Sequence, residues 1–171
     1  DCLVTNCAAY RGGGMMAAFG IVCALIEVRA SGRGQVIDAA MVDGSTLLMA
    51  QFYGFLAEGS WTQKRGDNIL DGGAPWYRTY ETLDGGHIAV GAFEQRFWEN
   101  FLAGLGLKQH QLPERSQPQN WEAIATIIAN KVGLQTLAHW TTIFDGADAC
   151  VTPVHGLRES IDHPHLRARG V

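Results

Sequence analysis

Residues 70–97 read LDGGAPWYRTYETLDGGHIAVGAFEQRF, and this stretch decides the fold of the chain. Two runs rich in β-forming residues flank Asp84, Gly85 and Gly86. Asp and Gly accept the positive φ angles that a tight hairpin turn requires. A helical run, EQRFWENFLAGLG, follows the second β run and starts at Glu94. The stretch therefore predicts a β-hairpin that leads directly into a helix.

The residues after this stretch form a series of short predicted elements. They are, in chain order, a loop at 109–119, a helix capped by Asn120 and running to Lys131, a helix at 135–144, a strand at 149–154, a helical turn at 157–161 and a terminal segment. Together with the hairpin, these pieces predict a small α+β domain in which helices pack on a short sheet.

Two apolar helical runs precede the hairpin. The first, at 15–30, follows three consecutive glycines and ends at the glycine pair around Arg33. The second covers residues 39–57, and a short β-type segment at 35–38 lies between the two runs. This pattern predicts a helix hairpin that must bury its apolar faces on other protein.

The predicted fold class is thus α+β, with the chain in three parts. Residues 1–60 form an apolar helix hairpin arm, and residues 61–74 form a polar, glycine-rich linker loop. Residues 75–171 form the small α+β domain, with a β-hairpin and a short sheet packed by helices.

The composition restricts the partners that we expect. Thirteen basic and seventeen acidic residues give a net charge of −4, and no basic cluster predicts binding to nucleic acid. The longest apolar stretch, at 15–28, is shorter than the roughly 20 residues of a membrane span and predicts a buried helix. We therefore expect no contact with nucleic acid or membrane.

The four cysteines give a further expectation about the compartment. Cys2, Cys7, Cys23 and Cys150 have neither zinc-site spacing nor the density of a secreted disulfide framework. The start of the chain shows no basic region followed by an apolar one, so no signal peptide is expected. These features predict a cytoplasmic protein with reduced cysteines.

Glu94 is the strongest candidate for chemistry. It lies where the apolar strand HIAVGA ends and a helix begins, a position where side chains converge on clefts. A carboxylate there can move a proton, or it can simply be a first-turn glutamate favoured by the helix dipole. The loop at 71–75 can approach a ligand with its backbone or form a plain turn.

Other candidates favour structural roles. The three glycines at 12–14 fit a tight entry to a packed helix better than an anion site at a helix N-terminus. Asp38 is expected to be a helix N-cap. His163 and His165 flank a proline and predict a helix entry rather than a metal site, so no metal is expected.

Three stretches of the chain resemble a known family. They are SGRGQVIDAAMVDGS at 31–45, the hairpin stretch at 70–97 and DACVTPV at 148–154. In this order they are similar to the family III CoA-transferase group, and most of all to its α-methylacyl-CoA racemases. The resemblance covers the downstream part of such a protein only and begins near Gly12, because CLVTNCAAYR before it looks unlike the family.

The resemblance implies an architecture. Members build a large Rossmann-like domain from both chain ends and a small α+β domain from the middle, and two such chains interlock as a dimer. The helical arm at 1–60 would then be a remnant of the large domain, which explains why its apolar faces lack cover.

The resemblance also implies chemistry, namely α-proton exchange on 2-methylacyl-CoA thioesters. Glu94, in GAFEQ, matches a catalytic glutamate that supports a histidine and an aspartate from a partner chain, while Gly72, Gly73 and Tyr77 match residues that face the thioester. The histidine's segment is missing, and Ala9 stands at the aspartate's position. No cofactor is implied, because the CoA thioester is itself the substrate.

Three hypotheses about function follow from the resemblance. The first is a truncated racemase that is inactive alone and self-associates through its apolar helices. The second is an active racemase or CoA transferase that a separate chain completes. The third is a CoA-binding or regulatory module. We favour the first, because acid–base catalysis cannot survive the loss of both proton carriers.

Overall fold

The structure, a computed structural model, describes the backbone of residues 2–170 and the side chains of residues 12–170. The chain divides into two units, Asp1–Thr62 and Gln63–Val171. Whether the first derives from a larger Rossmann-like domain stays a prediction.

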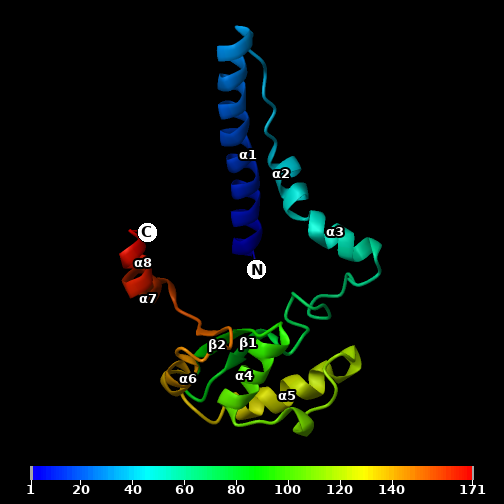
Figure 1. Ribbon diagram of the computed structural model, residues 1–171, viewed down its shortest axis with the longest axis vertical. Coiled ribbons are helices and arrows are strands. Elements are labelled where there is room, and N and C mark those ends of the chain that lie inside the picture. The colour runs from blue at the N-terminus through cyan, green and yellow to red at the C-terminus, as the bar shows by residue number, and fades with distance from the viewer. Residues whose placement is uncertain (1, 171) are drawn as a thin grey trace. The chain divides into compact units, whose positions relative to one another are not determined.

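The first unit is a helix hairpin. After helix α1 (Cys2–Ser31) the chain turns and returns in the opposite direction. The returning segment carries α2 (Met41–Leu48) and α3 (Ala50–Ala57), as Figure 1 shows in blue and cyan. The crossing of α1 and α2 is close because two glycines meet there. A Cβ atom added to Gly12 would lie 2.7 Å from the carbonyl carbon of Gly44.

Gly12 and Gly13 therefore have a packing role that differs from the expected one, whereas a Cβ atom at Gly14 would meet nothing within 4 Å. Helix α1 passes straight through residues 12–14, so their N–H groups lie inside a helix and not at its N-terminus. The anion-site interpretation is thus wrong, and so is the tight helix entry. Small residues here let two backbones approach, as at other close helix crossings.

Two further predictions for this unit are wrong. Residues 35–38 are not a strand, because a strand needs a partner to bond with and the described residues of this unit offer none. Asp38 is not a helix N-cap, since α2 begins after Ala40. The predicted second helix is interrupted at Met49, which separates α2 from α3.

The apolar face of α1 is open to solvent in this chain. The side chains of Met15, Phe19, Val22 and Ile26 are between 55% and 69% exposed. Helix α1, which the sequence predicted to be buried, is therefore not covered by other residues of this chain. Residues Gly12–Ser31 are also long and apolar enough to cross a membrane, a test that a core helix of a soluble protein passes too.

The second unit is built on a three-stranded antiparallel sheet. Its strands are β1 (Tyr77–Glu81), β2 (His87–Gly91) and β3 (Val151–Pro153), in the order β1-β2-β3. The predicted hairpin is confirmed, with Gly85 at φ +77° in the turn. Tyr80 lies opposite Ile88 in the β1–β2 register.

Helices make up most of the remaining described secondary structure of this unit. They are α4 (Gln95–Leu105), α5 (Trp121–Val132), α6 (Leu137–Phe144), α7 (Leu157–Asp162) and α8 (Pro164–Arg169), with short 3-10 turns at Gln109–Gln111 and Pro118–Asn120. The core between the sheet and α4, α5 and α6 is rich in large side chains: Ile88, Trp98, Phe101, Leu105, Ile124, Ile128, Val132 and Trp140 are all at most 3% exposed. The predicted α+β fold class is confirmed.

Capping differs in detail from the sequence prediction. Asn120 precedes α5, but its side chain makes no cap bond and donates instead to the carbonyl of Glu114. Thr136 caps α6 by accepting from the N–H of His139. The predicted helix entry at His163 and Pro164 is confirmed, because α8 starts there.

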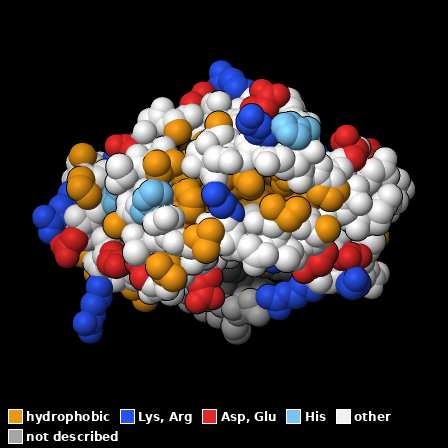
Figure 2. All heavy atoms as spheres, turned by 90° about the horizontal axis from the view of Figure 1, so that it is seen from below, with side chains coloured by type: hydrophobic (Ala, Val, Ile, Leu, Met, Phe, Trp, Pro, Cys, Tyr) orange, Lys and Arg blue, Asp and Glu red, His pale blue; other side chains and the backbone are white. Residues whose placement is uncertain are grey.

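The surface of the second unit carries mixed charge. Figure 2 shows Lys and Arg side chains interspersed with Asp and Glu, with groups of hydrophobic side chains between them. Ion pairs on this unit include Arg96 with Asp148 at 2.9 Å. Charges of both signs therefore share the face that this view presents.

Candidate functional site

The sheet of the second unit has one face in the core and one face toward a cavity. Side chains alternate along a strand, so Tyr80, Ile88 and Val90 point into the core. Tyr77 and Thr79, their neighbours in β1, are exposed. The other face of the sheet therefore forms the floor of a candidate site.

This face borders a cavity of about 610 Å³. Its lining comes from all three strands and from the loop before β1, and it comprises Leu70, Gly72, Tyr77, Arg78, Thr79, Ala89, Val90, Gly91, Cys150 and Thr152. Most of these side chains are small, which leaves the backbone accessible. A ligand there would meet apolar surface and main-chain groups together, the usual character of a small-molecule site.

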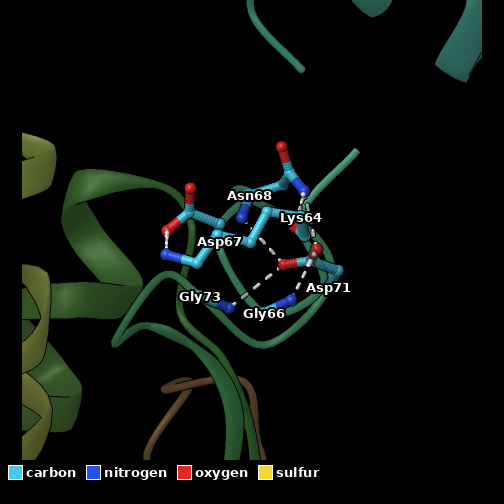
Figure 3. A network of polar contacts seen from close by, with 6 residues as sticks. All are labelled: Lys64, Gly66, Asp67, Asn68, Asp71 and Gly73. Carbon is cyan, nitrogen blue, oxygen red and sulfur yellow. Dashed lines mark hydrogen bonds and ion pairs between the residues drawn. The ribbon is translucent and has the colours of Figure 1, made fainter. Parts of the chain in front are cut away.

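The loop that carries Gly72 is organised by one carboxylate. Asp71 accepts hydrogen bonds from the main-chain N–H of Gly66 at 3.0 Å, of Asn68 at 2.9 Å and of Gly73 at 3.2 Å. It also accepts from the side-chain amide of Asn68 at 2.7 Å. Figure 3 shows these four contacts converging on the two carboxylate oxygens, beside the ion pair of Lys64 and Asp67.

These bonds affect the ionisation of Asp71. Partial burial acts to raise its pKa, but the hydrogen bonds from Asn68, Gly73 and Gly66 outweigh it and hold the pKa below the ordinary value. The carboxylate is therefore charged at neutral pH. Its charge stabilises the loop through these hydrogen bonds.

Gly72 and Gly73 serve this loop in different ways. Gly72 has φ +95°, a conformation that residues with a side chain rarely adopt. Gly73 packs so closely on Asn68 that an added Cβ would lie 2.7 Å from both its N and its O atom. Gly72 thus lines the cavity, whereas Gly73 lies behind it and sets the course of the loop.

Glu94 lies at the junction of strand and helix, as the sequence predicted. It is the residue before α4, with extended φ and ψ of −70° and 150°, and its carbonyl accepts from the N–H of Trp98 at 3.0 Å. Its exposed side chain makes no cap hydrogen bond. The carboxylate is therefore not engaged as a helix cap and belongs to the short segment between the end of β2 and the start of α4.

Cys150 links Glu94 to the cavity. The thiol lines the cavity, and its pKa is raised by burial first and then by the negative charges of Glu94 and Asp148, with Arg96 acting in the opposite direction. Glu94 therefore lies within electrostatic reach of the cavity wall, although it is not a lining residue. Cys150 itself has a positive φ of 50°, as does Asp148.

The structure brings together part of the predicted site. Gly72 and Tyr77 share the cavity wall, Gly73 supports their loop, and Glu94 lies within electrostatic reach of Cys150 in that wall. Their roles toward a substrate stay predictions. Sequence reasoning missed Cys150, and its only signal was a position just before the short strand β3.

Within residues 12–170, no group of three or more His, Cys, Asp or Glu side chains is placed to hold a metal ion. The rings of His155 and His163 lie 4.9 Å apart, and His155 also lies 4.0 Å from the carboxylate of Glu159. These contacts join the residues around α7 and α8. They do not form part of the cavity.

Comparison with known sequences identifies relatives. The sequence model of CoA-transferase family III matches residues 2–171. The chain is 47% identical over 162 residues to alpha-methylacyl-CoA racemase of Mus musculus, and 44% identical over 163 residues to the Homo sapiens protein of that name. Each match covers 95% of this chain but only 42% and 43% of those relatives.

More distant relatives share the same region. A succinyl-CoA:mesaconate CoA-transferase of Haloarcula marismortui is 26% identical over 162 residues, which is 89% of this chain and 38% of that protein. Among solved structures, Rv3272 from M. tuberculosis superposes with a TM-score of 0.71 at 16% identity, covering 93% of this chain and 41% of that one. The structural likeness supports the fold.

The family match also corrects one expectation. It begins at residue 2, so CLVTNCAAYR lies inside the matched region and the resemblance does not start near Gly12. The short motifs of the hairpin stretch were enough to find the family, but not its upstream limit. With the family model matching nearly every residue, this chain belongs to CoA-transferase family III.

Proposed function

We propose that this chain is the small-domain part of an acyl-CoA racemase that exchanges the α-proton of 2-methylacyl-CoA thioesters. The cavity over the open sheet face receives the acyl thioester, with Gly72 and Tyr77 in its wall. Glu94 supplies the carboxylate, within electrostatic reach of Cys150 in that wall. The proposal draws the reaction from the racemases of mouse and man, to which the chain is 47% and 44% identical.

One observation carries the proposal. The carboxylate of Glu94 is exposed, is not used as a helix cap, and lies close enough to the cavity to raise the pKa of the Cys150 thiol in its wall. A carboxylate that served only the helix would bond to the N–H groups of the first turn. This one is available to another group.

Glu94 cannot exchange an α-proton alone. The reaction needs one group to remove the proton and another to return it, with an enolate stabilised between them. The resemblance assigns these roles to a histidine, which lies in a segment that this sequence does not match, and to an aspartate, at whose position this chain has Ala9. We therefore propose that the chain by itself is inactive and contributes Glu94 and the cavity wall to a larger site.

The first test uses the chain alone. It is incubated with 2-methylacyl-CoA in deuterated water, and deuterium at the α-carbon is measured by mass spectrometry. We expect no exchange above the rate without protein. Exchange that disappears in the Glu94→Gln variant would contradict inactivity of the chain alone and favour a self-sufficient enzyme.

We also propose that the chain self-associates as a homodimer through the first unit. The exposed stripe of α1, formed by Met15, Phe19, Val22 and Ile26, repeats every three or four residues and so lies on one helix face. Apolar surface of this extent favours association. A sedimentation profile of a monomer at micromolar concentration would contradict this part of the proposal.

A further inference from the structure

Arg115 is a partly buried cation in the loop between α4 and α5. Its guanidinium carbon lies 5.0 Å from the ring centroid of Trp76 and 5.3 Å from that of Trp98, so two indoles hold the group by cation–π contact. The loop is anchored beside it, because the indole N–H of Trp121 donates to the carbonyl of Arg115 at 2.9 Å. The side chain is therefore held in a defined position.

The guanidinium binds the residues on both sides of Glu94. Its Nη2 atom donates to the main-chain carbonyl of Phe93 at 3.4 Å and to the side-chain oxygen of Gln95 at 3.0 Å. Glu94 itself is not a partner in these bonds. One nitrogen thus joins the last residue before Glu94 to the first residue of α4.

Gln95 extends this attachment. Its amide nitrogen donates to the carboxylate of Glu99 at 2.8 Å and to the side-chain oxygen of Gln109 at 3.1 Å. The amide therefore uses its oxygen for Arg115 and its nitrogen for α4 and the following loop. Both ends of the Gln95 side chain are committed, which fixes the direction in which the chain enters the helix.

We propose that Arg115 is a positioning residue that sets the location of the Glu94 carboxylate relative to Cys150 in the cavity wall. It acts on the backbone, by holding residues 93 and 95 while Trp76 and Trp98 hold the guanidinium. The importance of this location for catalysis rests on the proposed function. The location itself can be tested without any turnover.

The surroundings of Arg115 favour a specific role over a general surface charge. Among the described residues its Nη1 atom is buried without a hydrogen-bond partner, which is a cost that a surface arginine avoids. Burial lowers the pKa of the guanidinium, against the opposite effect of Glu114 and Glu99. The other terminal nitrogen, Nη2, makes the hydrogen bonds to residues 93 and 95.

Cys150 provides a reporter for the position of Glu94. The groups whose charges act on the thiol are Glu94, Asp148 and Arg96, in addition to its own burial. The pKa of the thiol is measured from the rate of alkylation by iodoacetamide against pH, followed by mass spectrometry of the peptide that contains Cys150. Cys23, which is exposed on α1, serves as an internal reference.

The experiment compares four proteins: the wild-type chain, Arg115→Met, Glu94→Gln and the double variant. We expect both single variants to lower the pKa of Cys150 toward its ordinary value, because each removes the charge of Glu94 from its present place. The double variant should have the same pKa of Cys150 as Glu94→Gln alone. Such non-additivity in a double-mutant cycle is expected when one residue acts through the other. An unchanged pKa in Arg115→Met, or an equal shift in the Glu94→Gln background, would overturn the proposal.

A second measurement separates positioning from loss of stability. Hydrogen exchange of the Trp98 N–H, which donates to the carbonyl of Glu94, should become about tenfold faster in Arg115→Met, as expected for losing bonds to a charged donor. Exchange of the β1–β2 ladder should stay unchanged. Equal acceleration in both places would mean general destabilisation and would refute a positioning role.

Two further variants complete the test. Arg158→Met removes an exposed guanidinium from α7. It should leave the pKa of Cys150 and the exchange rate of the Trp98 N–H unchanged. Arg115→Lys keeps a cation between the indoles but offers a compact ammonium in place of the planar fork. We expect it to behave like Arg115→Met. If Arg115→Lys kept the wild-type pKa of Cys150 and the wild-type exchange rate of the Trp98 N–H, a positive charge alone would be sufficient. That result would overturn the proposal that the guanidinium hydrogen bonds position Glu94.

Discussion

The phenol of Tyr80 donates a 2.5 Å hydrogen bond to the main-chain carbonyl of Pro75. Tyr80 is 3% exposed on the core face of β1, and Pro75 ends the loop that carries Gly72 and Gly73. The bond therefore ties the candidate site to the core of the second unit. Burial raises the pKa of Tyr80 far above its ordinary value, so the phenol stays protonated and able to donate.

Replacing Tyr80 by Phe should destabilise the second unit. The variant leaves the Pro75 carbonyl without this donor, so we expect the free energy of unfolding to fall by about 1–2 kcal/mol. Urea unfolding followed by tryptophan fluorescence measures the change. Tyr77→Phe, in the same strand but exposed, is the matched control and should unfold like the wild type.

Gly73→Ala tests the packing of the glycine loop. Its new Cβ would lie 2.7 Å from the backbone of Asn68, so the loop must move, at a cost of about 1–3 kcal/mol. Gly156→Ala is the control, since its Cβ would meet only Glu159 at 3.5 Å, an ordinary contact. Equal unfolding free energies for the two variants would contradict the described packing.

The conformation of the loop at 66–73, which carries Gly72 and Gly73, should depend on the ionisation of Asp71. Because the folded-state pKa is lowered, the stabilisation is complete above the unfolded-state pKa of about 3.9 and is lost as pH falls through the folded-state value. NMR signals of the Gly66 and Gly73 N–H groups should shift together only in that acidic range. The Asp71→Asn variant should lack this transition, and its persistence there would assign it to another group.

The apolar stripe of α1 should control self-association. Replacing Phe19 and Ile26 together by Glu removes two exposed apolar side chains, each worth about 1.5–3 kcal/mol when fully buried. We expect dimer dissociation constants to rise by more than about tenfold. Leu157→Glu, at an exposed position of α7 in the second unit, is the control, and an equal effect there would place the interface elsewhere.

The sequence predicted local structure best where the signal was local. The turn at Asp84, Gly85 and Gly86 predicted the hairpin, because positive φ and alternating side chains are properties of neighbouring residues. The segment at 35–38 was misread because β propensity does not create a strand without a partner. The packing of Gly12 was not predicted because its partner, Gly44, lies in another helix.

In the candidate site, too, the sequence predicted the features with a local signal and missed a contact between distant residues. Glu94 was found because a strand–helix junction is visible in the sequence, and the glycine loop because its composition is unusual. The contact between Arg115 and residues 93 and 95 joins positions about twenty apart through a loop of irregular structure. No periodicity marks such a contact, so only the folded chain reveals it.

The role of Glu94 in an acyl-CoA racemase is the central claim, and a chimera tests it most directly. Residues 12–171 of this chain replace their counterparts in alpha-methylacyl-CoA racemase of Mus musculus, which supplies the remainder and keeps its own residue at the position of Ala9. Deuterium incorporation at the α-carbon of 2-methylacyl-CoA is measured for the chimera and for its Glu94→Gln variant. We predict an active chimera whose rate falls on the order of 10²-fold with Gln at position 94; an active chimera with an unchanged rate in that variant would contradict the account.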